Sequence, residues 1–293
     1  MGSDFMDGLE RAAALLPPDM RPAALSAADA EEFRLRSGRR PAYLSGDAET
    51  ELDGCRAVTP EDLDGVLERA TRASVHSAQS SLKNGFVTVA GGVRLGVCGS
   101  VILSDGAPAG IRRLSGAAVR IPRQVGGCCD GTFPALTDGG FKNTLIISRP
   151  GGGKTTYLRE LIRRLSDSGA RVGLADERGE VAAVWNGVPQ FDVGRRTDVM
   201  SDAPKAASAE MLLRSMNPQI LAMDEITAPG DVEAVFDSVG CGVKLLATAH
   251  AGSWNEFCSR RLYRAIVTGR IFKRVVIIEA NGGARSYSVE EKP

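Results

Sequence analysis

The sequence lacks any long uninterrupted run of apolar residues. Of its 293 residues, 43% are hydrophobic and 25% are charged, values that are ordinary for a globular protein and exclude a disordered or fibrous chain. No apolar run approaches the roughly 18 residues that a membrane-spanning helix needs. The first ten residues, MGSDFMDGLE, are acidic and have no basic segment followed by an apolar one, so we do not expect a secretory signal. We therefore expect a cytoplasmic protein.

Histidine is scarce and the cysteines follow no metal-binding pattern. There are 2 histidines and 6 cysteines, and no two cysteines have the C-x-x-C spacing. A zinc site or a small secreted disulfide framework needs regular cysteine or histidine spacing. We therefore expect reduced thiols and no structural metal. We interpret the Cys128–Cys129 pair as two small buried or half-buried residues near a linker, and the alternative is a redox or acylation site.

The sequence has no net charge, but its acidic and basic residues are unevenly distributed along the chain. The 36 basic and 36 acidic side chains cancel. Residues 1–70 hold 15 acids and 8 bases, whereas residues 82–125 hold 6 bases and 1 acid, and residues 260–274 hold 6 bases and no acid. Basic stretches can contact nucleic acid, anionic lipid or a phosphate held by a neighbouring subunit. The alternative for each stretch is a solvated face.

The length predicts about two domains. Residues 1–75 are rich in Ala, Leu and Glu and predict short helices, whereas residues 82–125 alternate polar and apolar side chains between glycines and predict β-hairpins. Residues 126–140 contain five glycines and a proline, which is typical of a linker. We predict a smaller α+β N-terminal domain over residues 1–135 and a second domain over residues 136–293.

The second domain alternates predicted strands with predicted helices. A helix is indicated by apolar residues at helical spacing from Tyr157 to Leu165. A later helix is expected to begin at Ser201 or Asp202 and to end before Pro218, with Leu212, Leu213 and Met216 on one face. The predicted strands cover residues 144–147, 171–175, 220–223, 243–247 and 275–278. This alternation predicts a parallel sheet covered by helices, an α/β fold.

A glycine-rich loop lies between the first of these strands and its helix. The residues Pro150, Gly151, Gly152, Gly153, Lys154, Thr155 and Thr156 match the end of a P-loop. Glycine lets a phosphate chain approach the backbone amides closely, and the helix N-terminus attracts the anion. We expect Lys154 to reach the β- and γ-phosphates and Thr155 to ligate Mg²⁺. The first glycine of the motif is replaced by Ser148.

Polar residues follow three other predicted strands. Asp224 and Glu225 follow one strand, Asp176 and Glu177 follow another, and His250 ends a third. In an open parallel sheet, ligands bind beyond the carboxyl ends of the strands. We expect Asp224 to hold Mg²⁺, Glu225 to polarise the attacking water, and His250 to contact phosphate.

In order and content, these motifs resemble the stage III sporulation protein AA family, a relative of the hexameric ATPases of type II and type IV secretion and pilus systems. The likeness covers roughly residues 80–280 and is looser over the first 75. The matching segments are 85–88, 94–97, 121–123, 151–156, 176–180, 192–199, 214–218, 223–226 and 248–251.

The resemblance implies a RecA-like or AAA+-type P-loop domain that binds ATP and Mg²⁺. The acidic box of these ATPases matches Asp176-Glu177, their histidine box matches residues 248–250, and their Walker B glycine-glutamate pair matches Asp224-Glu225 with Asp in place of Gly. The resemblance implies that Glu225 is catalytic and that Glu177 and His250 assist it. The candidates for arginines that reach the nucleotide are Arg112, Arg113, Arg120, Arg123 and Arg196.

The resemblance also implies a homo-oligomer, a hexameric ring, that works with a membrane-embedded channel component at its cytoplasmic face. The protein would lie on the mother-cell side of a channel between mother cell and forespore, peripheral to the membrane. Two other functions stay open. One is a nucleic-acid-binding P-loop ATPase, although the basic stretches hold few aromatics for base stacking. The other is a nucleotide-gated scaffold with little turnover. A small-molecule kinase fits least, since no acceptor site or lid segment is visible.

Overall fold

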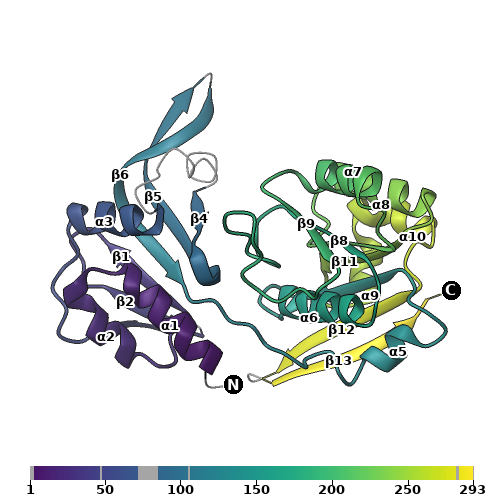
Figure 1. The fold of residues 1–293 in the computed structure, drawn as a ribbon, viewed down its shortest axis with the longest axis horizontal. Coiled ribbons are helices and arrows are strands. Elements are labelled where there is room, and N and C mark those ends of the chain that lie inside the picture. The colour runs from purple at the N-terminus through teal and green to yellow at the C-terminus, as the bar shows by residue number, and fades with distance from the viewer. Residues whose placement is uncertain (1–2, 47, 72–84, 105, 282–283, 293) are drawn as a thin grey trace. The chain divides into compact units, whose positions relative to one another are not determined.

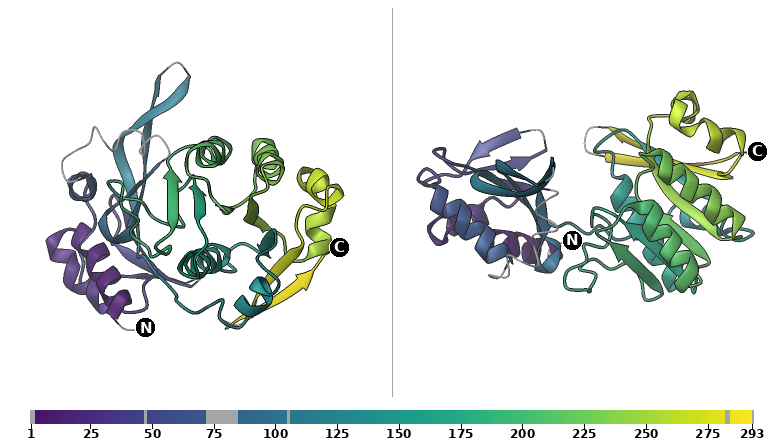
Figure 2. Two further views of the ribbon diagram at one scale, coloured as in Figure 1. Left: turned by 45° about the vertical axis from the view of Figure 1, so that its right-hand side comes forward. Right: turned by 90° about the horizontal axis from the view of Figure 1, so that it is seen from above.

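The computed structural model describes all residues except 1–2, 47, 72–84, 105, 282–283 and 293. The described chain divides into two compact units (Figures 1 and 2). Unit 1 comprises residues 1–124 together with residues 184–190, and unit 2 comprises residues 125–183 and 191–293. Among the described residues, no helix is long and apolar enough to cross a bilayer. All six cysteines are free.

Unit 1 is an antiparallel six-stranded sheet with helices on it. The sheet order is β3-β2-β1-β6-β5-β4. Its helices are α1 (Ser3–Leu15), η1 (Pro18–Met20), α2 (Arg21–Ser26), α3 (Pro60–Thr71) and η2 (Ala90–Gly92). Its strands are β1 (Glu32–Arg36), β2 (Ala42–Ser45), β3 (Ala48–Glu51), β4 (Phe86–Thr88), β5 (Arg94–Ser104) and β6 (Ala107–Arg120). Apolar residues from α1 and α3 pack with alternate residues of the strands in one core.

The prediction of short helices throughout residues 1–75 is wrong for residues 32–36, 42–45 and 48–51, which form β1, β2 and β3. In β1, Phe33 and Leu35 are buried while the charged residues on either side of each are more exposed. This period of two is that of a half-buried strand. The stretch is only five residues long, so its alternation is hidden within an Ala- and Glu-rich segment.

Unit 2 is a seven-stranded sheet in the order β13-β12-β7-β11-β10-β8-β9. Its strands are β7 (Thr144–Ser148), β8 (Val172–Asp176), β9 (Thr197–Ser201), β10 (Ile220–Met223), β11 (Lys244–His250), β12 (Arg274–Asn281) and β13 (Ala284–Glu291). Its helices are α5 (Phe133–Thr137), α6 (Lys154–Asp167), α7 (Lys205–Ser215), α8 (Pro229–Gly240), α9 (Trp254–Ser259), η3 (Arg261–Tyr263) and α10 (Arg264–Thr268). All neighbouring strands are parallel except β12 and β13.

The five strands predicted for this part of the chain are present, and β9 and β13 were not predicted. The later helix begins at Lys205 rather than at Ser201 or Asp202, because Ser201 is the last residue of β9. Of the three apolar residues expected on its buried face, only Leu212 is fully buried, whereas Met216 is 40% exposed.

The sheet packs helices on both faces, which fixes where its strands end. Leu145 and Ile147 of β7 share a core with residues of α7 and α8. Ile146 between them is also fully buried and points to the opposite face, where α6 lies (Figure 1). Parallel pairing aligns His250 with Ser148 and Met223 with Ala247. The carboxyl ends of β7, β11 and β10 are therefore neighbours along one edge of the sheet.

Candidate functional site

The loop after β7 contains three glycines that meet different structural requirements. Gly151 and Gly153 have φ angles of 73° and 98°, a region that side chains disfavour. Gly152 needs space instead, since a Cβ there would lie 2.5 Å from Ser148 Oγ. The Ser148 hydroxyl donates to the carbonyl of Arg149 at 2.8 Å. The serine at the first glycine position is thus accommodated because residue 152 has no side chain.

The loop leads directly into α6, whose first residue is Lys154. The first amides of a helix have no partner within it, and they carry partial positive charge. Lys154 is 6% exposed, and burial lowers the pKa of its ammonium, although Glu225 and Asp224 oppose the shift. Amides, a helix N-terminus and a cation therefore point to an anion site at this loop.

Lys154, His250 and Glu225 form a chain of contacts across three strand ends. Lys154 Nζ donates to His250 Nδ1 at 2.7 Å. That bond leaves the ring proton on Nε2, which lies 3.0 Å from Glu225 Oε1. Glu225 has a φ of 27°, an uncommon backbone conformation that is concentrated at functional sites. Its amide is held by the hydroxyl of Thr248 at 2.9 Å.

Asp224 lies between the loop and β11. Its carboxylate accepts from Thr155 Oγ1 at 3.3 Å and from Thr248 Oγ1 at 3.0 Å. Burial raises the pKa of Asp224 to about 6, and the nearby carboxylates Glu180, Asp176 and Glu225 add to the shift while Thr248 opposes it. A divalent cation would relieve this crowding of negative charge. A hydroxyl and a carboxylate at this separation also form an oxygen donor set of the kind Mg²⁺ prefers.

The acidic residues after β8 have other partners. Asp176 is 1% exposed and accepts hydrogen bonds from the amides of Glu180, Val181 and Ala182. Burial raises the pKa of Asp176 against these bonds. Glu177 Oε2 lies 2.7 Å from Lys205 Nζ. Asp176 therefore shapes the loop that follows it, and Glu177 is tied to α7 rather than to Lys154 or Asp224.

Arg159 is a residue of this region that the motifs did not indicate. It lies on the buried side of α6, donates to the carbonyls of Val181 and Glu180 at 2.6 and 2.7 Å, and stacks over the ring of Phe191 at 3.9 Å. Burial lowers the pKa of Arg159 to about 10. The sequence does not single it out, because α6 also carries Arg163 and Arg164.

Arg285 is a second such residue. It lies near the start of β13, and its Nε donates to the carbonyl of Gly152 at 3.3 Å. The same guanidinium group covers Gly153, where an added Cβ would lie 2.9 Å from Arg285 Nε. A stack of Tyr287 on Tyr157, with ring centroids 5.2 Å apart, joins the same hairpin to α6. No local pattern marks this arginine, because the pairing of β12 with β13 brings it to the loop.

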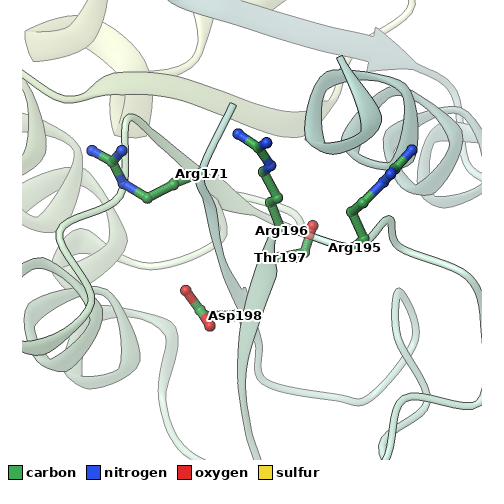
Figure 3. A pocket seen from close by; sticks show the side chains of 5 residues that line it. All are labelled: Arg171, Arg195, Arg196, Thr197 and Asp198. Carbon is green, nitrogen blue, oxygen red and sulfur yellow. The ribbon is translucent and has the colours of Figure 1, made fainter. Parts of the chain in front are cut away.

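The arginine candidates fall in two places. Arg112, Arg113 and Arg120 lie on β6 of unit 1, and Arg123 follows that strand and pairs with Glu31 at 3.1 Å. Arg196 belongs to unit 2 and donates to the carbonyl of Gly169 at 2.7 Å. It lines a cavity near the amino ends of β8 and β9, together with Arg171, Arg195, Thr197 and Asp198 (Figure 3). That end of the sheet is opposite to the P-loop, so Arg196 does not join Lys154 within one chain.

The family model for "Sporulation stage III, protein AA" matches residues 20–288. The chain belongs to this family. Stage III sporulation protein AA of Bacillus subtilis (strain 168) is 34% identical over 272 residues, which cover 88% of this chain and 85% of that protein. The predicted family is confirmed, and the match begins closer to the N-terminus than the motifs indicated.

Solved structures show what fold the family adopts. The chain is similar to the ATPase DotB of Legionella pneumophila, with a TM-score of 0.58, 14% identity, and coverage of 97% of this chain and 79% of that one. It is also similar to the pilus retraction motor PilT with bound ADP, with a TM-score of 0.60, 16% identity, and coverage of 90% and 80%. These likenesses confirm the predicted RecA-like α/β fold with its parallel sheet.

Proposed function

We propose that the protein is a Mg²⁺-dependent ATPase. One observation carries the proposal: the loop after β7 and the residues at the ends of β10 and β11 are brought into direct contact, from Lys154 through His250 to Glu225 and from Thr155 to Asp224. A P-loop with a carboxylate pair and a histidine at neighbouring strand ends is arranged for hydrolysis of a phosphoanhydride.

Each residue has a role in this proposal. The amides of residues 151–153 and the ammonium of Lys154 bind the phosphates, with Pro150 and Thr156 flanking them. Thr155 and Asp224 would hold Mg²⁺, which would supply charge neutralisation for the phosphates.

Glu225 takes a proton from water as the water oxygen bonds to the γ-phosphorus and the bond to ADP breaks. His250 orients Glu225 through its Nε2–H and accepts from Lys154 at Nδ1, so it positions both residues. Glu177 assists through α7, since Lys205 holds it.

The family supports a proposal for the cellular role. We infer that the protein forms a homo-oligomeric ring, a hexamer, on the cytoplasmic, mother-cell side of a membrane channel that links mother cell and forespore, and that it powers or assembles that channel. In such a ring the arginines Arg112, Arg113, Arg120, Arg123 and Arg196 are candidates to complete a neighbour's site. Support comes from the family match and from the fold shared with a pilus retraction motor.

Phosphate release from ATP tests the catalytic assignment. We expect Lys154→Ala to lose turnover because it loses phosphate binding. Glu225→Gln should retain ATP binding and lose about 100-fold or more in rate, since it removes the base. Lys244→Ala and Glu233→Gln are matched controls, because both residues are exposed in unit 2. Equal rates in all variants would remove the catalytic assignment.

Two other outcomes would point to the remaining functions. Tight ATP binding with turnover and assembly unaffected by Glu225→Gln would indicate a nucleotide-gated scaffold. Stimulation of turnover by single-stranded nucleic acid, with binding that weakens steeply with salt, would indicate a nucleic-acid-binding ATPase.

A further inference from the structure

A cavity of about 360 Å³ lies near the amino ends of β8 and β9, within unit 2 (Figure 3). Its lining consists of Arg171, Arg195, Arg196, Thr197 and Asp198, all of which the structure describes. The volume is within the range of small-molecule sites, about 300–1,000 Å³. Three arginines in so small a cavity favour an anionic ligand, and no residue of the P-loop contributes to the lining.

The pairing of the two strands brings two of these charges together. β8 and β9 are parallel with Val172 opposite Thr197, and the amide of Val172 donates to the carbonyl of Arg196 at 3.0 Å. Arg171 and Arg196 therefore occupy neighbouring positions where the strands begin. Like charges at neighbouring cross-strand positions repel each other, and no ion pair of either arginine is found among the described residues. An anion that both guanidinium groups contact would offset this repulsion.

Backbone carbonyls hold both of these side chains in place. Arg171 Nε donates to the carbonyl of Asn217 at 3.0 Å, and Arg196 Nη1 donates to the carbonyl of Gly169 at 2.7 Å. A guanidinium group has five N–H donors, so each arginine retains donors for a ligand. Side chains that are already held lose less conformational entropy when a ligand binds. The two arginines therefore form a preorganised anion site.

The charge of the lining indicates which anion fits. Arg195 Nε lies 3.5 Å from Asp167 Oδ1, but Asp167 is shared with Arg163 Nη1 at 3.3 Å and does not line the cavity. The lining itself carries three positive charges and one negative charge, that of Asp198, a balance of +2. A phosphate monoester carries about −1.5 to −2 at pH 7. It therefore matches the lining better than a carboxylate, which carries a single charge.

Asp198 restricts the choice of phosphate further. Its carboxylate lies apart from the three guanidinium groups in Figure 3, and no hydrogen bond or ion pair of Asp198 is found in the part of the chain that the structure describes. An ionised carboxylate only accepts hydrogen bonds. It therefore repels a bare anion, but it can accept from a hydroxyl group of a larger ligand. This arrangement favours a molecule with a phosphate at one end and hydroxyl groups at the other.

We propose that this cavity binds a sugar phosphate, with the phosphate at Arg171 and Arg196 and a sugar hydroxyl at Asp198. Nucleoside monophosphates belong to the same class, because they contain ribose phosphate. The cavity and the P-loop lie at opposite ends of the strands, so the two sites are separate. The proposal does not depend on ATP hydrolysis.

Calorimetry on the full chain tests the proposal with ribose 5-phosphate, inorganic phosphate and ribose as probes. We expect the wild type to bind ribose 5-phosphate about tenfold more tightly than inorganic phosphate, and ribose without measurable heat. The double variant Arg171→Gln with Arg196→Gln should bind ribose 5-phosphate about thirtyfold more weakly, since it loses two charge-assisted hydrogen bonds. Asp198→Ala should weaken ribose 5-phosphate about fivefold and bind inorganic phosphate at least as tightly as the wild type, because a repelling charge is removed.

Two controls separate the cavity from other effects. Lys154→Ala removes the cation of the P-loop, which also attracts phosphate, and it should bind ribose 5-phosphate as the wild type does. Arg214→Gln with Arg264→Gln is the matched control, because both are exposed arginines of unit 2. Ribose 5-phosphate should raise the unfolding temperature of the wild type and of both controls. Circular dichroism checks the fold of the double variant at Arg171 and Arg196, and Asp198→Ala alone decides the test if that variant is unfolded.

Four results would overturn the proposal: a wild type that does not bind ribose 5-phosphate, equal affinity for ribose 5-phosphate and inorganic phosphate, binding that the cavity variants leave unchanged, and binding that Lys154→Ala abolishes. The last would assign the phosphate to the P-loop. ATP turnover is measured on the same samples, so failure of the ATPase assignment and failure of the cavity proposal give different results.

Discussion

At the scale of single residues, Arg285 makes the most specific prediction, because it reaches the P-loop from the last hairpin of the fold. Its guanidinium bonds the carbonyl of Gly152 and covers Gly153. We expect Arg285→Ala to raise KM for ATP about tenfold while kcat changes less than about twofold. Because the guanidinium lies at the loop proposed to bind the phosphates, we expect it to contact a phosphate away from the bond being broken, and such a contact binds substrate and transition state equally. Steady-state kinetics of phosphate release measures both constants.

Arg285→Lys distinguishes charge from shape at this position. Lysine keeps the positive charge but lacks the planar fork that bonds two oxygens, so it should recover part of the loss in KM. Arg214→Ala on α7 is the control, since Arg214 is an exposed arginine that pairs only with Glu210 on the same helix. Arg285→Ala kinetics identical to those of this control would contradict a phosphate contact.

Asp224 predicts how activity depends on pH. Its pKa is raised to about 6 by burial and by neighbouring carboxylates, and only the ionised form can hold Mg²⁺. Hydrolysis at low Mg²⁺ should therefore fall as the pH decreases through about 6. Saturating Mg²⁺ should move this fall to lower pH, because the cation competes with the proton. A pH–rate profile that is the same at both Mg²⁺ concentrations would contradict the metal role of Asp224.

In the absence of metal, the raised pKa of Asp224 makes stability fall as the pH rises, whereas activity is expected to rise with pH. A carboxyl group whose folded pKa is raised binds its proton more tightly in the folded state. Its stabilising contribution is present below the ordinary pKa of about 4 and is lost as the pH rises through about 6. Adding Mg²⁺ to metal-free protein should therefore raise its unfolding temperature most strongly above pH 6. Thermal unfolding with and without Mg²⁺ at several pH values measures this.

At the scale of secondary-structure elements, Arg159 joins α6 to the loop after β8. Arg159→Met keeps the length of the side chain but leaves the carbonyls of Glu180 and Val181 without their donor. We expect the free energy of unfolding to fall by about 2–4 kcal/mol, since buried charged hydrogen bonds are costly to break. Urea unfolding measures this, with Arg214→Ala as a surface control that should change it by less than about 1 kcal/mol. A change no larger than that of the control would show that the loop does not depend on α6.

How far the sequence predicts the elements depends on how strongly each one is patterned. The buried strands β7, β8, β10 and β11 are continuous apolar runs, so they and the P-loop between β7 and α6 could be predicted. β13 could not, because its side chains are mostly exposed and the pattern is weak. The same holds for β9, an edge strand whose residues are all half-buried. Pairing partners, rather than local sequence, create these two strands.

Some contacts of the candidate site could likewise be predicted from the sequence, and others could not. Parallel strands end at one edge, so the proximity of Asp224, Glu225 and His250 to Lys154 followed from sequence order alone. The contact of Glu177 with Lys205 did not, since it depends on where α7 begins. That start was predicted too early because β9 occupies the expected cap. Arg285 depends on the antiparallel return of β13, which no motif encodes.

At the scale of the whole molecule, the chain passes between its two units three times, since residues 184–190 belong to unit 1 although they lie within the sequence of unit 2. A nucleotide bound at the P-loop of unit 2 can therefore influence unit 1 through several covalent connections. A ring in which neighbouring subunits complete each other's sites would use this coupling, because binding in one subunit would favour the conformation that its neighbour contacts.

Light scattering of the full chain tests this coupling. We expect the mass to rise from that of a 30.9 kDa chain to a multiple of it when a non-hydrolysable ATP analogue and Mg²⁺ are added, because the analogue stabilises only the assembled form. Lys154→Ala should not respond, and Lys244→Ala should respond as the wild type does. An unchanged mass, with analogue binding demonstrated by calorimetry on the same sample, would contradict assembly driven by the nucleotide.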